Sequence, residues 1–443
     1  MTATLTERQR VPDILECLAQ LSSDEVPTPP KLANAMLDLL PAEVWQNPGY
    51  RWLDPCSKSG VFLREIAKRL LFDGLVTWEP DFEKRREHIF RHMIYGCGIT
   101  ELTGIIARRT VYYSRHAAGE HSVIEFDSDH GNVPFVRAKH DLEKGRCRIC
   151  GAPEGLERGD GRENYAYAFI HGAYPTEEMR DLKFDVIVGN PPYQLEDQGH
   201  GNSARPIYQH FVERAIDLNP RYVLMITPSR WFVAGKGLDQ YRARMLADKR
   251  IRALVDYPKL YEGFPGVKIR GGVSYFLWDR EYDGPCSVQT ILDGKPLGEP
   301  IERHLDTYGV LVRRNEAVAI LDKVRAFRHE GRPEATLGKK VSSRKPFGLP
   351  TNFHGHASST GMSDPIKLHG SQKVTWVGAG RYSAELEMDR PLESSHDEGS
   401  RHERSSRDAV PEPPDHRWSP RGLHGDLCSC RTVRQRDWSG TVR

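Results

Sequence analysis

Four consecutive residues near the middle of the chain are suited to gripping a planar amine: Asn190, Pro191, Pro192 and Tyr193. They directly follow residues 184–189, an apolar segment that predicts a buried strand. Two consecutive prolines restrict the backbone, so that the carbonyl groups at the strand end keep one direction. We therefore expect the Asn190 side-chain oxygen and the Pro191 carbonyl to accept the two amine hydrogens, while the Tyr193 ring stacks on the group that carries the amine. The alternative is a rigid turn that only ends a strand.

A second segment has the order of a ligand-binding turn. Residues 51–55 predict a short strand, residues 56–60 a turn, and residues 61–71 a helix whose apolar residues lie on one face. Asp54, at the end of the strand, suits a bound ammonium group, and a helix N-terminus at Gly60 suits a carboxylate. As an isolated string the pattern is equally consistent with a local structural turn.

The elements that position these residues alternate between strands and helices. Such repetition predicts a parallel sheet covered by helices, an α/β fold. The predicted strands are residues 51–55, 94–99, 184–189, 222–227, 251–256 and 272–278, and the predicted helices are residues 31–40, 61–71, 102–109, 207–218 and 238–248.

In this order of motifs, residues 25–280 resemble the N6-adenine DNA methylases of restriction-modification systems in which the cofactor motif precedes the catalytic motif. The resemblance implies a Rossmann-like S-adenosylmethionine-dependent methyltransferase sheet. It also implies methyl transfer to the N6 amino group of an adenine that has left the double-stranded DNA stack. The implied catalytic residues are Asn190, Pro191, Pro192 and Tyr193, and the implied cofactor-binding residues are Thr28, Pro29, Asp54, Cys56, Ser57, Gly60, Phe62 and Glu101.

The chain departs from the family pattern at two positions. Lys58 stands where the first glycine of the cofactor motif is expected, and Gly98 stands where the family places an acid that holds the ribose hydroxyls. Glu101, three residues further on, is expected to replace that acid, although a role in capping a helix explains it equally well.

Three segments after the catalytic loop resemble parts of the family's target pocket: residues 207–213, 225–230 and 271–277. Lys268 and Arg270 lie close to the predicted catalytic face, so we expect them to contact DNA phosphates. Two alternatives stay open at this point. The same tetrapeptide serves methyltransferases of RNA or of protein glutamine, and the chain could be a non-catalytic DNA-binding remnant.

Periodicity fades between residues 115 and 175, which predicts an insertion in the sheet. The insertion contains Cys147 and Cys150, half of a zinc knuckle, with His140 and His171 as possible partners. The prediction is a structural zinc ion that takes no part in methyl transfer, and its alternative is two free thiols in a turn.

The chain divides into four expected regions: an N-terminal helical lead (1–24), the catalytic domain (25–285), a partial target-recognition region (286–385) and a disordered tail (386–443). Because the net charge is only +2, any binding to DNA must depend on local patches of basic side chains. The chain has no apolar run long enough to span a membrane and its cysteines are scattered, so we expect a cytoplasmic protein without disulfides. About 25 residues precede the first motif, too few for a nuclease domain, so any restriction endonuclease is expected to be a separate partner.

Overall fold

The computed structural model describes residues 26–154, 166–179, 181–195, 205–233, 235, 237–259, 261–267, 269–329, 353–362, 365–369 and 374–378. The predicted N-terminal lead, the tail after 385, and Lys268 lie outside these residues. The chain separates into two compact units, Met1–Val324 and Arg325–Arg443, which are described separately.

The first unit is built on one sheet, in which nine strands of the described chain take part. The strand order is β10-β9-β7-β8-β6-β5-β1-β2, and β11 pairs with β9. The four strands β2, β1, β5 and β6 are parallel, whereas β8 runs antiparallel between β6 and β7. The strands are β1 (Trp52–Ser57), β2 (Ile94–Gly98), β5 (Val186–Gly189), β6 (Tyr222–Pro228), β7 (Ile251–Tyr257), β8 (Val273–Asp279), β9 (Cys286–Leu292), β10 (Lys295–Pro296) and β11 (Ile301–Arg303).

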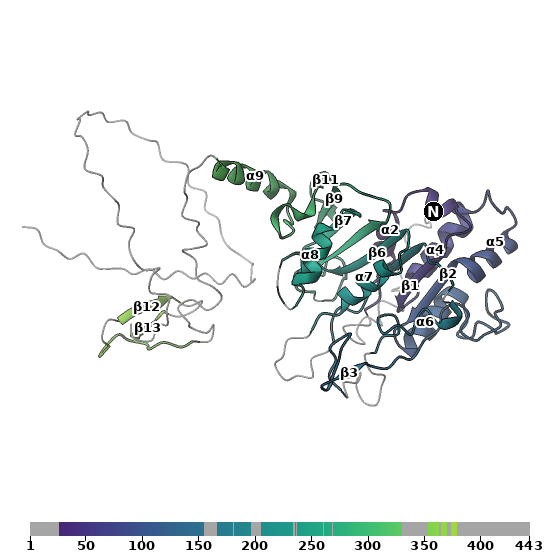
Figure 1. The fold of residues 1–443 in the computed structure, drawn as a ribbon, viewed down its shortest axis with the longest axis horizontal. Coiled ribbons are helices and arrows are strands. Elements are labelled where there is room, and N and C mark those ends of the chain that lie inside the picture. The colour runs from purple at the N-terminus through teal and green to yellow at the C-terminus, as the bar shows by residue number, and fades with distance from the viewer. Residues whose placement is uncertain are drawn as a thin grey trace, which may run out of the picture. The chain divides into compact units, whose positions relative to one another are not determined.

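Helices cover both faces of this sheet (Figure 1). Alternate residues of each strand point to opposite faces, because the side-chain period of a strand is two. In β1 and β5, Trp52 and Val186 pack in one core cluster, whereas Leu53 and Ile187 pack in the other. The first cluster contains residues of α2, α4 and α6, and the second contains residues of α7 and α8. The result is a three-layer α/β sandwich.

The predicted Rossmann-like α/β fold is confirmed, and the predicted strands and helices of residues 31–278 all form. The α-helices of the first unit are α2 (Pro30–Leu37), α3 (Glu43–Gln46), α4 (Val61–Arg69), α5 (Phe82–His88), α6 (Glu101–Tyr112), α7 (Tyr208–Asp217) and α8 (Asp239–Ala247). Single π-helical turns follow α4 (Leu70–Gly74) and α5 (Ile89–Met93), and 3₁₀ turns span Glu177–Met179, Ser229–Phe232 and Leu305–Tyr308.

The insertion between β2 and β5 has little regular structure. Its described part contains the hairpin of β3 (Leu142–Glu143) and β4 (Arg146–Cys147).

The sheet continues past residue 285, where sequence periodicity weakens. β9 pairs in parallel with β7, and β11 pairs with β9. Arg313 then joins this segment to the sheet through a two-pronged ion pair with the fully buried Asp256, at 2.7 and 2.8 Å. The assignment of residues 286–385 to target recognition stays a prediction.

Helix α9 (Asn315–His329) crosses the boundary between the two units. In the second unit, β12 (Pro365–His369) and β13 (Val374–Gly378) form an antiparallel pair. Among the described helices, none has the length and apolarity needed to cross a membrane.

Candidate active site

The two predicted loops, residues 56–60 at the end of β1 and residues 190–193 after β5, meet at the topological switch point of the sheet. Strands β1 and β5 are parallel neighbours, but the helices that follow them, α4 and α7, cover opposite faces. A crevice therefore opens between the carboxyl ends of the two strands, which is where ligands bind in open α/β sheets. The loops approach closely, since a Cβ atom on Gly189 would lie 2.8 Å from Cys56 Sγ.

Asn190 is held in one orientation at this crevice. Its Nδ2 donates to the Val26 carbonyl oxygen at 3.3 Å and to Thr28 Oγ1 at 3.1 Å. A carbonyl only accepts, so the side-chain nitrogen must face Val26 and the oxygen must face the other way. Asn190 Oδ1 is buried and has no hydrogen-bond partner within the described chain. The residue thus presents a buried acceptor without a donor.

Tyr193 lines a cavity of about 240 Å³ beside the loop at residues 190–193. Pro191 and Pro192 before it are buried, and its ring makes an edge contact with Phe264 at 6.4 Å between centroids. The cavity walls include three residues of the segments predicted to form a target pocket, Tyr208, Pro228 and Arg230, and the predicted phosphate contact Arg270. Aromatic and cationic side chains around a space of this size suit a planar, electron-rich group.

Asp54 is a buried carboxyl, 3% exposed, on the adjacent strand. Burial raises the pKa of Asp54 from 3.8 to about 7, although the backbone N–H of Cys56 and the charge of Lys58 act in the opposite direction. The Cys56 N–H donates to Asp54 Oδ1 at 3.2 Å. A carboxyl that titrates near neutral pH in a crevice is a candidate ligand for a cation.

The turn after Asp54 needs a glycine at position 60 and not at position 58. Gly60 has φ +72° at the N-terminus of α4, and a Cβ atom there would lie 2.9 Å from the Ala107 carbonyl oxygen. Lys58 is not among the described residues with positive φ, so its backbone does not require a glycine. The departure from the family pattern at Lys58 therefore leaves the turn intact.

The Lys58 side chain is buried inside the crevice. Its Nζ donates to the Val26 carbonyl oxygen at 3.3 Å and lies 6.0 Å from the centroid of the Tyr193 ring. The remaining cavity between the two loops measures about 10 Å³, no more than one water molecule occupies. It is lined by Thr28, Asp54, Cys56, Lys58, Ser59, Gly60, Val61, Phe62 and Asn190. The structure thus brings together five of the predicted cofactor residues, Thr28, Asp54, Cys56, Gly60 and Phe62, and a sixth, Ser57, is fully buried between them in the sequence.

Gly98 is explained by packing. A Cβ atom at this position would lie 2.7 Å from the backbone of Gly104 in α6, so no acid fits at the end of β2. Glu101 is the first residue of α6, has an exposed side chain, and lies 3.7 Å from Arg137. It does not line the cavity next to Asp54. Its role toward a ribose stays a prediction.

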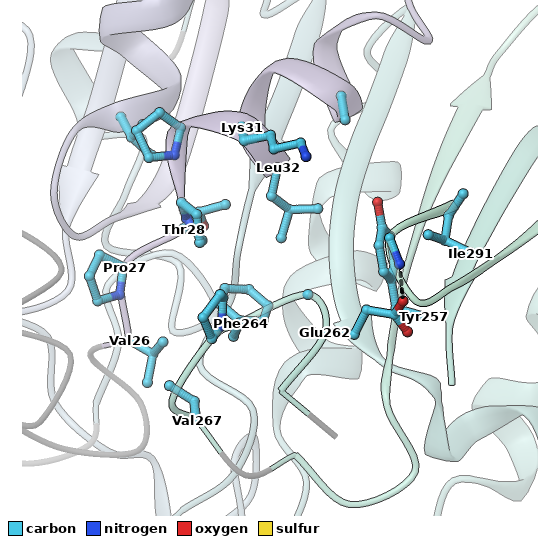
Figure 2. A pocket seen from close by; sticks show the side chains of 17 residues that line it. Val26, Pro27, Thr28, Lys31, Leu32, Tyr257, Glu262, Phe264, Val267 and Ile291 are labelled. Atoms are coloured by element: carbon cyan, nitrogen blue, oxygen red, sulfur yellow. Dashed lines mark hydrogen bonds between the residues drawn. The ribbon is translucent and has the colours of Figure 1, made fainter. Parts of the chain in front are cut away.

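Thr28 and Pro29 also line a larger cavity of about 410 Å³. Figure 2 shows Val26, Pro27 and Thr28 facing Phe264 and Val267 across this cavity, with Tyr257 and Ile291 on its far side. Thr28 lines both cavities, so the segment 26–29 separates them.

The sequence does not predict two interactions at and near the site. The Val26 carbonyl oxygen accepts from both Asn190 and Lys58, and Arg313 neutralises Asp256, which also accepts from Ser229 Oγ at 2.7 Å. A backbone carbonyl leaves no mark in the sequence. An arginine paired across 57 residues could have been found only by noting that Asp256 lies in a buried strand and needs a cation.

Of the predicted phosphate contacts, Arg270 is exposed at the rim of the 240 Å³ cavity, and Lys268 lies outside the described residues. The predicted knuckle cysteines, Cys147 and Cys150, are both buried in the insertion, where His140 and His171 approach them.

Comparison with known proteins identifies relatives. The model of the Eco57I restriction-modification methylase family matches residues 92–264. A protein of Mycoplasma pneumoniae described as an uncharacterized adenine-specific methylase is 34% identical over 339 residues, which cover 70% of this chain and 80% of the relative.

Solved structures are more distant. A complex of DrdV with DNA is 14% identical with a TM-score of 0.43, over 67% of this chain and 33% of the other. The type I restriction-modification methyltransferase subunit from Streptococcus thermophilus is 12% identical with a TM-score of 0.40, over 72% of this chain and 57% of the other. The chain thus spans about a third and just over half of these two proteins. By its likeness to the Mycoplasma protein, the chain belongs to the adenine-specific methylase family and contains an Eco57I restriction-modification methylase domain.

Proposed function

We propose that this protein transfers a methyl group from S-adenosylmethionine to the N6 amino group of adenine in DNA, as the modification component of a restriction-modification system. The observation that carries the proposal is the orientation of Asn190. Its amide nitrogen is occupied by Val26 and Thr28, which leaves Oδ1 as a buried acceptor without a partner in the described chain. An unsatisfied buried acceptor costs about 1–3 kcal/mol, a cost that a bound amine would remove.

The residues act by holding the amine. In free adenine, the lone pair of the exocyclic nitrogen is delocalised into the ring. When Asn190 Oδ1 and the Pro191 carbonyl accept the two hydrogens, the nitrogen is fixed and its lone pair is directed at the methyl donor. The cavity lined by Tyr193 and Tyr208 accommodates the base after it leaves the duplex. Positioning of this kind supplies most of the rate enhancement, so no side chain has to act as a nucleophile.

The residues around Asp54 fit S-adenosylmethionine, which supplies the methyl group when it is bound. The Asp54 carboxylate suits the ammonium group of its methionine part, and the N-terminus of α4 at Gly60 suits its carboxylate. The buried Ser59 hydroxyl also has no hydrogen-bond partner among described residues, which adds an unused polar group at the same place. One residue restricts the fit, because the buried Lys58 side chain lines the small cavity that Asp54 and Asn190 also line, and it must move to admit the donor.

Lys58 also favours the second candidate function, a DNA-binding protein that no longer transfers methyl groups. Binding of the methyl donor separates the two candidates, since only the enzyme requires it. Arg230 and Arg270 at the target cavity suit DNA phosphates in either case. A separate restriction endonuclease as partner stays a prediction.

The test combines donor binding with methyl transfer. S-Adenosylmethionine is titrated into the full chain by calorimetry, and the same preparation is incubated with labelled donor and DNA that lacks adenine methylation. Digestion to nucleosides and mass spectrometry then identify the product. We expect N6-methyladenine from the wild-type protein. We also expect at least about a hundredfold slower transfer from Asn190→Ala, because the acceptor that fixes the amine is lost.

The control is Asn47→Ala, because Asn47 is exposed and lines neither of the cavities beside the two loops, and the transfer rate of this variant should equal that of the wild type. If the protein binds the donor and methylates RNA or a protein glutamine but not DNA, then the proposed substrate is wrong and the methyltransferase acts on that other molecule. No donor binding would refute the methyltransferase and leave the DNA-binding remnant.

A further inference from the structure

The insertion assembles four side chains that match a metal-binding site in type and spacing. Ligand atoms of His140, Cys147, Cys150 and His171 all lie within 4.8 Å of one another. Cys147 Sγ is 3.4 Å from His171 Nε2, and Cys150 Sγ is 3.5 Å from His140 Nδ1. In a tetrahedron with Zn–S of about 2.3 Å and Zn–N of about 2.0–2.1 Å, the sulfur–nitrogen edge measures roughly 3.5 Å. We propose that these four residues bind one zinc ion.

The surroundings of the four side chains support this assignment. His171 Nδ1 lies 2.8 Å from the Tyr167 carbonyl oxygen, which requires the proton to be on Nδ1 and leaves the Nε2 lone pair facing Cys147. Metal-bound histidines commonly have a second partner of this kind. Both cysteines are buried, at 3% and 0% exposure, so their sulfur atoms are protected from solvent.

The backbone between the cysteines has the shape of a knuckle. The Gly151 N–H donates to the Cys147 carbonyl at 2.9 Å, and the Cys147 N–H donates to the Ala152 carbonyl at 2.8 Å. Cys147 lies at the end of the β3–β4 hairpin. Two thiolates and two neutral imidazoles would balance the charge of Zn²⁺, so the buried site would carry no net charge.

The zinc site would connect the insertion to the helix behind the catalytic loop. Its ligands come from three separate parts of the chain, around residues 140, 147–150 and 171. The neighbouring residues Tyr167 and Phe169 pack on Phe211 of α7, with ring centroids 5.5 and 6.1 Å apart. Helix α7 begins at Tyr208, which lines the target cavity. The metal therefore positions a wall of that cavity and takes no part in methyl transfer.

The metal content of the protein tests this assignment independently of its activity. The full chain, without an affinity tag and from zinc-supplemented cells, is analysed by elemental mass spectrometry. We expect about one zinc per chain in the wild type, a large loss in Cys150→Ser, and an unchanged content in His121→Asn, which alters an exposed histidine outside the cluster. His171→Cys should retain zinc, because cysteine replaces one ligand with another, whereas His171→Ala should lose it.

Cobalt provides a second measurement that does not depend on the folding of a variant. Wild-type protein stripped with a chelator is titrated with Co²⁺, and a tetrahedral thiolate spectrum that saturates at one equivalent is expected. Wild-type protein with only trace zinc and no such spectrum would overturn the proposal and leave two thiols that hydrogen-bond to histidines. Equal zinc in the wild type and in Cys150→Ser would overturn it as well.

Discussion

Replacing Asp54 with asparagine should stabilise the protein, and the gain should depend on pH. The folded protein holds a proton on Asp54 up to about pH 7, whereas the unfolded chain releases it near the usual pKa of 3.8. The folded state therefore binds more protons between these pH values, and the free energy of unfolding falls as the pH rises through this range. Above about pH 7 the loss is complete. Asparagine preserves the acceptor for the Cys56 N–H but has no charge to bury.

The size of the effect follows from the pKa. A rise from 3.8 to about 7 corresponds to about 4 kcal/mol, at ~1.36 kcal/mol for each pH unit. The advantage of Asp54→Asn should grow by about 3 kcal/mol between about pH 5 and pH 8. At ~2 °C for each kcal/mol in a large domain, the difference in Tm should increase by about 5 °C.

Differential scanning calorimetry at the two pH values measures this change. Asp73→Asn is the control, because Asp73 is exposed and its variant should show no pH-dependent gain. Binding of S-adenosylmethionine should weaken in Asp54→Asn. The carboxyl group that destabilises the fold when it is charged would then also be the group that binds the donor. A difference in Tm that is the same at both pH values would refute the reasoning, because the carboxyl would then not be neutral at low pH.

Two further predictions concern side chains that the sequence pattern did not explain. Lys58→Ala should bind S-adenosylmethionine at least about tenfold more tightly in calorimetry. The donor no longer has to break the bond of Lys58 Nζ to the Val26 carbonyl oxygen, and hydrogen bonds to charged groups contribute ~1.5–3 kcal/mol. Weaker binding would instead make Lys58 a ligand of the donor. Arg313→Ala should lower the free energy of unfolding by about 3–5 kcal/mol, since it leaves the carboxylate of Asp256 buried and unpaired, whereas the exposed neighbour Arg314→Ala should change it little. Denaturant unfolding compares the two, and equal midpoints would contradict the prediction.

The sequence was most informative where local pattern and tertiary packing agree. Residues 184–189 and 222–227 are apolar throughout, because the strands they form are buried on both faces, and such strands were found with bounds close to those observed. The loop at residues 190–193 stands out in the sequence because two consecutive prolines after such a strand are rare, and its catalytic role stays a prediction. The position of this loop beside Asp54 is a finding of the structure, in which β1 and β5 are neighbours.

Other features depend on atoms that no pattern encodes. The sequence shows Lys58 in the place of a glycine, but the position of its side chain inside the crevice depends on its reaching Val26, 32 residues away. The sheet after residue 285 was missed because β9 is only half buried along its length, so its pattern is weak. The histidines around the knuckle were noted as possible partners, but only the fold could show that all four side chains converge.

The Val26 carbonyl oxygen has a consequence for how the two ligands of the site affect each other. It accepts from Lys58 on the cofactor turn and from Asn190 on the catalytic loop. A donor molecule that displaces Lys58 leaves Asn190 as the remaining side-chain partner of this oxygen among the described residues, so occupation of one subsite changes the hydrogen bonding of the other. Such coupling is reciprocal by thermodynamic necessity. The affinity for the methyl donor and the affinity for the extruded base are then linked through a single backbone atom.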